Sequence, residues 1–149
     1  SVNTIFYALP HLKASHGRLV GISSLTGKNG VPTRSAYAAS KHAMAGFFDS
    51  IRIELQEDGV TVTMIYPGFV ATEVRQRAIR GDGSPLQDSY LDESKLMSAD
   101  ECARIIIDAV AKRKREVVMT TKAKIGQWIK LISPSLIDKL AQKTVMSGK

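Results

Sequence analysis

Apolar and polar positions follow two different periods along the chain, and together they predict a strand, a helix and a second strand. The apolar runs over 17–24 and 60–66 have the length and composition of buried strands. Between them, residues 35–58 repeat large apolar side chains every three or four positions, which is typical of a helix. Two parallel strands joined by a crossover helix form a right-handed unit, so we expect both strands to end at one edge of a sheet.

The flanking segments carry helix and strand signals of the same kind. Residues 3–15 are expected to form the tail of a helix. A second helix is predicted over 98–113, where Ser98 and Glu101 have the spacing of a capping box. Residues 116–120 read as the last strand. The chain is therefore expected to alternate helices and strands, as α/β proteins do.

Two segments without a clear period are expected to lie at the carboxyl edge. Glycine, asparagine and proline over 25–34 predict a loop there, and the hydroxyl of Thr26 either contacts substrate or stabilises this loop. The polar segment 73–97 is predicted to form a short helix followed by a mobile lid, with Tyr90 and Leu91 lining a pocket. A disordered excursion fits that segment equally well.

The predicted helix over 35–58 has two distinct faces, with Ser35 suited to its N-cap. One face is large and is expected to pack on the sheet: Tyr37, Lys41, Met44, Phe48, Ile51 and Leu55. The other contains only small residues: Ala36, Ala39, Ala43, Gly46 and Ser50. A small-residue face lets a second helix approach closely, and that helix comes either from the same subunit or from a partner.

Candidate chemistry begins with Tyr37 and Lys41, which share one helical face because they are four residues apart. A cation fixed beside a phenol favours the phenolate, so a tyrosine in such a setting can act as an acid or base. The spacing alone also fits an exposed tyrosine beside a solvated lysine. However, Ser24 ends the first strand and Pro67-Gly68 ends the second, so all these groups converge on the edge where α/β sheets bind ligands.

This serine, the Tyr-x-x-x-Lys motif and the segment 67–72 (Pro-Gly-Phe-Val-Ala-Thr) resemble the short-chain dehydrogenase/reductase family. The resemblance implies the carboxyl-terminal half of a Rossmann-type, doubly wound parallel α/β sheet. It also implies that Ser24 binds the substrate oxygen, that Tyr37 transfers the proton, and that Lys41 supports this transfer while holding the nicotinamide ribose. By the same matching, NAD or NADP is bound by Tyr37 and Lys41 and, at its nicotinamide end, by Pro67, Gly68, Val70 and Thr72, and NADP is slightly favoured.

The implied reaction interconverts a ketone or aldehyde and an alcohol on a small apolar or lipid-like substrate held by Ser24, Thr26 and Tyr37. The residues around these motifs are similar to those of hydroxysteroid dehydrogenases and their membrane-associated relatives. The resemblance also implies homo-oligomers that form through the helix over 35–58. The family's glycine-rich pyrophosphate turn has no counterpart in the chain, and Asn3 does not match its catalytic asparagine. A catalytically incompetent fragment or a partner-binding half-domain therefore remains the alternative.

The resemblance implies that residues 1–120 of the 149 form the carboxyl-terminal half of an NAD(P)-binding Rossmann-type domain, and residues 121–149 are expected to form an amphipathic helical tail. Cys102 is the single cysteine, which excludes an internal disulfide and fits an intracellular location, either cytoplasmic or peripheral to a membrane. His11 and His16 have no partners at metal-ligand spacing, so no metal site is expected. The sequence shows no signal peptide and no continuous membrane-spanning stretch.

Positive charge gathers in the last third of the chain, where residues 101–149 carry eleven Lys or Arg and four Asp or Glu. No aromatic platform or recognition helix accompanies this charge, so nucleic acid is not an expected partner. The tail predicts two helices separated at Ser133-Pro134, with an apolar stripe of Ile125, Trp128, Ile129, Ile132, Leu136, Ile137, Leu140 and Ala141. Lys124, Lys130, Lys139 and Lys143 stand off that stripe. The pattern suits a membrane surface, and it also suits a cap over the substrate pocket or a second subunit.

Overall fold

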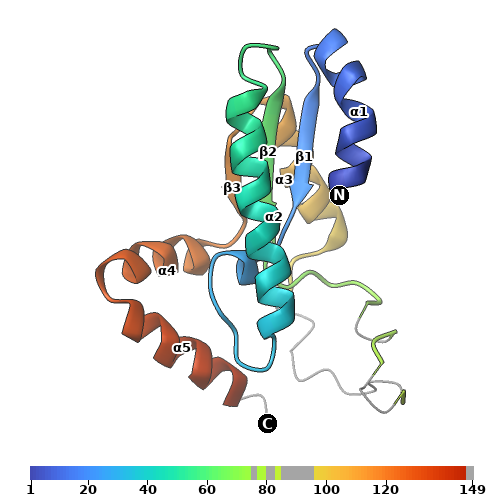
Figure 1. Ribbon diagram of the computed structural model, residues 1–149. Helices are drawn as coiled ribbons and strands as arrows, with labels where there is room; N and C mark the ends of the chain where they lie inside the picture. Colours follow the sequence, from blue (N-terminus) through green and yellow to red (C-terminus); the bar gives the residue numbers. More distant parts are fainter. Residues whose placement is uncertain (75–76, 80–82, 85–95, 147–149) are drawn as a thin grey trace.

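The computed structural model describes residues 1–74, 77–79, 83–84 and 96–146. Its elements alternate along the chain as the sequence predicts (Figure 1): α1 (Val2–Ala14), β1 (Arg18–Ile22), the 3-10 turn η1 (Leu25–Gly27), α2 (Ser35–Glu54), β2 (Thr61–Tyr66), α3 (Ala99–Ala111), β3 (Glu116–Val118), α4 (Thr121–Ile132) and α5 (Pro134–Met146). Tyr90 and Leu91, the predicted lid residues, lie outside the described residues.

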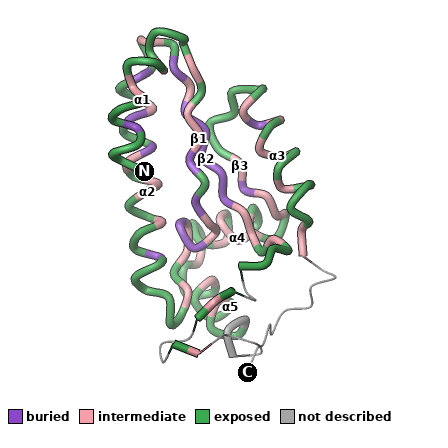
Figure 2. Tube along the Cα trace, turned by 90° about the vertical axis from the view of Figure 1, so that its right-hand side faces the viewer, coloured by how far each residue is buried: buried purple, intermediate pink, exposed green. Residues whose placement is uncertain are grey.

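The three strands form a parallel sheet in the order β1-β2-β3, with Val20 opposite Thr63 and Ile65 opposite Val117. Helices α1 and α2 cover one face of this sheet and α3 covers the other (Figures 1 and 2). Since all three strands are parallel, their carboxyl ends meet at one edge. The predicted α/β layering and the crossover from β1 through α2 to β2 are confirmed.

The core forms where α2 crosses the two longer strands. Strand β2 is buried on both faces, as expected for a central parallel strand. Phe48 and Ile51 of α2, with Leu55 just after the helix, are buried in the same core cluster. A Cβ on Gly21 would lie 2.7 Å from Cε1 of Phe48, so only glycine lets the ring lie this close to β1. Each of these large side chains contributes roughly 1.5 to 3 kcal/mol by its burial.

The ends of the helices differ in part from the prediction. Ser35 is the first residue of α2 rather than its N-cap; Arg34 occupies that position, without a side-chain capping bond. The helix ends at Glu54 instead of 58, and a turn follows in which Gly59 takes a positive φ of 68° before β2. At α3 the predicted cap is present, since the hydroxyl oxygen of Ser98 accepts the N–H of Glu101 at 3.1 Å.

The small-residue face of α2 is exposed: Ala36, Ala39, Ala43, Gly46 and Ser50 all face solvent. In the part of the chain that the structure describes, no atom lies within 4 Å of where a Cβ on Gly46 would stand. Packing of this face against a helix of the same chain, one of the two predicted alternatives, is therefore absent from the described residues.

The tail forms the two predicted helices, and the break falls at Ser133-Pro134. Lys130, predicted to stand off the apolar stripe, is exposed, and its ammonium donates to the backbone carbonyl of Lys28. None of the described helices is long and apolar enough to cross a bilayer.

Candidate active site

Ser24 lies two residues after β1, at the start of the loop at the carboxyl edge. The residue before it, Ser23, still donates its N–H to Ile65 at 2.8 Å, so the pairing of the two strands continues to the edge. Ser24 has an extended backbone, and its hydroxyl oxygen accepts the N–H of Thr26 at 3.2 Å. Ser24 therefore caps η1, which holds its hydroxyl at a defined position.

Thr26 lies inside this turn and is buried. The hydroxyls of Ser24 and Thr26 are 3.4 Å apart, within reach of a weak hydrogen bond. Of the two roles that the sequence left open, these contacts favour a hydroxyl that stabilises the loop. The cap by Ser24 is a role that sequence reasoning did not assign, although Ser-x-Thr after a strand is a usable signal for it.

Gly27 brings the loop onto the helix that carries the tyrosine and the lysine. A Cβ on Gly27 would lie 2.6 Å from Oγ of Ser23 and 3.0 Å from the carbonyl oxygen of Lys41. The hydroxyl of Ser23, which is buried, donates to the same carbonyl at 3.4 Å. Sequence reasoning missed both residues. Their contacts place the loop that begins at Ser24 beside the first turns of α2.

Tyr37 and Lys41 face the same edge from α2. The ammonium of Lys41 lies 5.6 Å from the centroid of the Tyr37 ring and donates to the carbonyl of Ile22, the last residue of β1, at 3.4 Å. Tyr37 is 43% exposed, so its phenol is accessible to a substrate. The structure thus brings the predicted pair together with the end of β1, one residue before Ser23.

The segment after β2 meets the same loop. The carbonyl of Pro67 accepts the N–H of Leu25 at 3.1 Å, and a Cβ on Gly68 would stand 3.1 Å from Cγ2 of Thr120, just after β3. All three strand ends therefore converge around η1. The remaining cofactor candidates lie farther along the chain: Val70 forms a parallel bridge with Met97, and Thr72 is exposed.

The arrangement places two hydroxyl groups and one cation at an open edge. A hydroxyl donor and a nearby ammonium can stabilise negative charge that develops on a carbonyl oxygen, and a phenol can supply the proton. Among the residues that the structure describes, no group of three or more His, Cys, Asp or Glu could hold a metal ion. Proton transfer to or from an oxygen is the chemistry that this edge favours.

A second feature, absent from the sequence predictions, ties the loop to β3 and α4. The ammonium of Lys28 lies 2.7 Å from a carboxylate oxygen of Glu116 and 4.3 Å from the centroid of the Tyr66 ring. Burial raises the pKa of the Tyr66 phenol, and the cation of Lys28 opposes part of that rise. With Lys130 bound to the carbonyl of Lys28, the loop after Ser24 is anchored from two sides.

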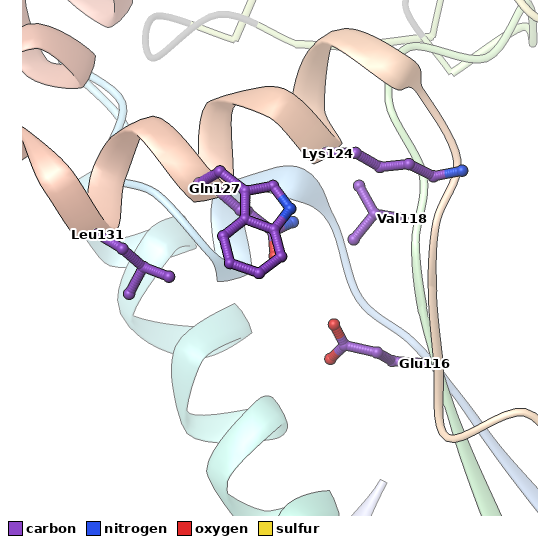
Figure 3. Close-up of a pocket in the computed structure, with 6 residues that line it drawn as sticks. Glu116, Val118, Lys124, Gln127 and Leu131 are labelled. Atoms are coloured by element: carbon purple, nitrogen blue, oxygen red, sulfur yellow. The ribbon is translucent and has the colours of Figure 1, made fainter.

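A hollow of about 390 Å³ lies between β3 and α4 (Figure 3). Its lining consists of Glu116, Val118, Lys124, Gln127, Trp128 and Leu131. None of the predicted catalytic or cofactor-binding side chains is among them, so this hollow is distinct from the candidate active site.

Comparison with known proteins agrees with this geometry. The family model for the short chain dehydrogenases matches residues 1–82. A dehydrogenase/reductase SDR family protein 7-like of Dictyostelium discoideum is 36% identical over 147 residues, which cover 99% of this chain and 45% of that protein. The dehydrogenase/reductase SDR family member 7B of Mus musculus is 36% identical over 130 residues, or 87% of this chain and 40% of that protein. The chain thus spans less than half the length of these relatives.

Among solved structures, a short chain dehydrogenase from Burkholderia cenocepacia J2315 in complex with NADP superposes with a TM-score of 0.70 and 20% sequence identity. The match covers 94% of this chain and 53% of that one. At this identity the likeness concerns the fold alone, and it confirms the prediction of a Rossmann-type parallel sheet.

Proposed function

We propose, since the chain belongs to the short-chain dehydrogenase family, that it supplies the catalytic half of an oxidoreductase that interconverts a ketone or aldehyde and an alcohol. The observation that supports this proposal most is the placement of Lys41 between the Tyr37 ring and the last residue of β1, beside the loop that Ser24 caps. A general dehydrogenase/reductase role follows from the family, and the roles of individual residues are our proposal.

In the direction of reduction, the hydroxyl of Ser24 donates a hydrogen bond to the substrate oxygen and orients the carbonyl. Tyr37 gives its phenolic proton to the same oxygen as negative charge develops there. The ammonium of Lys41, 5.6 Å from the centroid of the ring, stabilises the phenolate that Tyr37 becomes. In the oxidation of an alcohol the same groups act in reverse, with the phenolate of Tyr37 accepting the hydroxyl proton.

A nicotinamide dinucleotide, NAD or NADP, supplies or accepts the hydride when it is bound. The residues present fit the nicotinamide end of such a group. An ammonium has three donors, and Lys41 directs one to the carbonyl of Ile22, so the others can reach ribose hydroxyls. The turn at Pro67-Gly68 lies at the same edge, where the carbonyl of Pro67 accepts the N–H of Leu25 and the missing Cβ of Gly68 leaves room for Thr120.

We expect substrates to be small apolar or lipid-like carbonyl compounds or alcohols.

The exposed small-residue face of α2 is where we expect two subunits to meet, as the family resemblance implies. Replacing Gly46 by tryptophan should reduce self-association in sedimentation experiments. The same replacement at Gly30, where a Cβ also meets no atom within 4 Å, serves as the control.

The alternative, a half-domain that binds a partner without catalysis, is favoured only by the short span of the chain relative to its relatives. One assay separates the two functions. The chain is joined to the segment of the Dictyostelium relative that precedes the aligned region, and oxidation of NADH and NADPH is followed with a panel of ketones and aldehydes. Turnover of at least one carbonyl compound supports the oxidoreductase. A folded chimera that binds NADPH and turns over none of them would leave the partner-binding function.

A further inference from the structure

Helix α4 leaves its large apolar side chains mostly exposed, and two of them, Trp128 and Leu131, also line the open hollow beside β3. Trp128, Leu131 and Ile132 are 70%, 78% and 85% exposed, and Ile125 lies one turn before them on the same side. A helix on a soluble protein ordinarily buries such a stripe and exposes its polar side. In α4 the larger apolar side chains are exposed instead.

The contacts on the opposite side of α4 fix this orientation. Thr120 caps the helix by accepting the N–H of Ala123 at 3.3 Å, and Ala123 packs against the core. A Cβ on Gly126 would lie 3.8 Å from Ile137, where α5 packs on α4. Lys130 donates to the carbonyl of Lys28. Rotating α4 to bury Trp128 would break these contacts together, so the apolar side stays outward.

Exposed cations lie on both helices of the tail. Residues 121–149 contain six lysines and one acidic residue, Asp138. Lys122 and Lys124 are exposed on α4, and Lys139 and Lys143 are exposed on α5. The apolar part of a lysine side chain can lie along an apolar surface while its ammonium reaches water or an anionic headgroup. Tryptophan is enriched at the interface between membrane and water.

We propose that the α4–α5 hairpin is a docking surface for an anionic lipid membrane, on which it lies without crossing the bilayer. Apolar side chains flanked by lysines match the acyl boundary and the negative headgroups of such a surface. A second copy of the chain is a poorer occupant. Each copy carries a net charge of +7, and apposing two hairpins would bring their lysines together.

The hairpin lies at the same end of the molecule as the loop after β1 and the amino end of α2 (Figure 1). Docking there would hold the carboxyl edge of the sheet close to the membrane, whatever reaction that edge carries. This arrangement gives an apolar compound dissolved in the bilayer a short path to Tyr37. The docking itself does not depend on the proposed carbonyl chemistry.

Trp128 is the only tryptophan in the chain, so its fluorescence reports on α4 alone. The experiment adds phosphatidylcholine vesicles, with and without phosphatidylserine, to the chain at low and high salt. We expect a blue shift of Trp128 emission and cosedimentation of the chain with the vesicles that contain phosphatidylserine. Both effects should weaken as salt rises, because screening reduces the attraction of the lysines to the headgroups.

Variants test the two components of the surface separately. Leu131→Ser with Ile132→Ser should lower partitioning by more than tenfold, since burial of each side chain contributes roughly 1.5 kcal/mol or more. Ile53→Ser with Ile107→Ser is the matched control, because both positions are equally exposed on other helices, and it should change nothing. Lys139→Gln should lower partitioning about fivefold, as expected for one cation near an anionic surface, and Arg104→Gln should not.

Three results would overturn the proposal. One is the absence of any fluorescence shift with anionic vesicles. Another is partitioning that the Leu131→Ser, Ile132→Ser variant retains although circular dichroism shows it folded. The last is self-association without lipid that this variant abolishes, which would assign the surface to a second copy of the chain.

Discussion

Gly27 lies directly against Lys41: a Cβ on the glycine would stand 3.0 Å from the carbonyl oxygen of Lys41 and 3.2 Å from its Cβ. The loop that begins at Ser24 can therefore pack this closely on the helix that carries Tyr37 only because Gly27 has no side chain. Because the segments that carry the proposed catalytic residues come from different elements, this contact sets the geometry between them.

Adding one methyl group at Gly27 should disturb this geometry. We expect Gly27→Ala to displace η1, to lower stability by about 1 to 3 kcal/mol, as overpacking does, and to lower kcat more than stability alone explains. Gly30→Ala is the control, since a Cβ there meets no atom within 4 Å. Denaturant unfolding and steady-state kinetics of the two variants provide the comparison, and equal behaviour would show that the contact does not position the loop.

The ion pair of Lys28 and Glu116 should matter for the loop more than for overall stability. Both side chains are partly exposed, so we expect a coupling of about 0.5 to 1 kcal/mol in a double-mutant cycle of Lys28→Met and Glu116→Gln. The pair of Lys13 and Asp58, also 2.7 Å apart, provides a matched cycle away from the loop. If kcat falls in the variants of Lys28 and Glu116 but not in those of Lys13 and Asp58, the first ion pair positions the loop. If kcat falls in both sets of variants, the loss of activity is due to lower stability.

Stability should fall in alkaline solution because of Tyr66. Burial raises the pKa of this phenol above the ordinary value of 10.0, so the unfolded chain loses its proton first as the pH rises. The contribution of Tyr66 is thus fully present below about pH 10 and declines as the pH passes through the raised pKa of the folded state. Tyr66→Phe should unfold with a weaker pH dependence above pH 10, as measured by chemical denaturation; an unchanged slope would exclude this cause.

The 149-residue chain alone should show no measurable affinity for NADH or NADPH by calorimetry. It holds the segment expected near the nicotinamide, but not the glycine-rich turn that binds the pyrophosphate in this family. Tight binding by the isolated chain would mean that another part of it binds the phosphates.

The sequence predicted those features that depend on local pattern. The period of 35–58, the apolar run before Tyr66 and the turn at Ser133-Pro134 each depend on neighbouring residues, and each prediction is confirmed to within a few positions. The meeting of Ser24, Tyr37 and Lys41 at one edge was also predictable, because parallel topology brings strand ends together.

Contacts between distant residues left no such signal. Lys28 and Glu116 are 88 residues apart, and Lys130 meets Lys28 across 102 residues, so neither contact could be found from spacing. The N-cap of α2 is Arg34 rather than Ser35, a difference of one residue that the local pattern does not resolve, because helix ends are less sharply defined than helix interiors. The outward side of α4 is likewise set by what its other side touches.

The most direct test of the account is the turnover of the complete chimeric domain after Tyr37→Phe, which removes one hydroxyl and leaves the aromatic ring. Tyr7→Phe is the matched control, because Tyr7 is also an exposed tyrosine but lies on a different helix, α1. We predict that Tyr37→Phe lowers kcat for carbonyl reduction by roughly 100- to 10,000-fold, the range for loss of a general acid, while thermal unfolding and NADPH binding stay as in the parent and in Tyr7→Phe. Turnover equal to that of the parent would contradict the proposed role of Tyr37 as the proton donor.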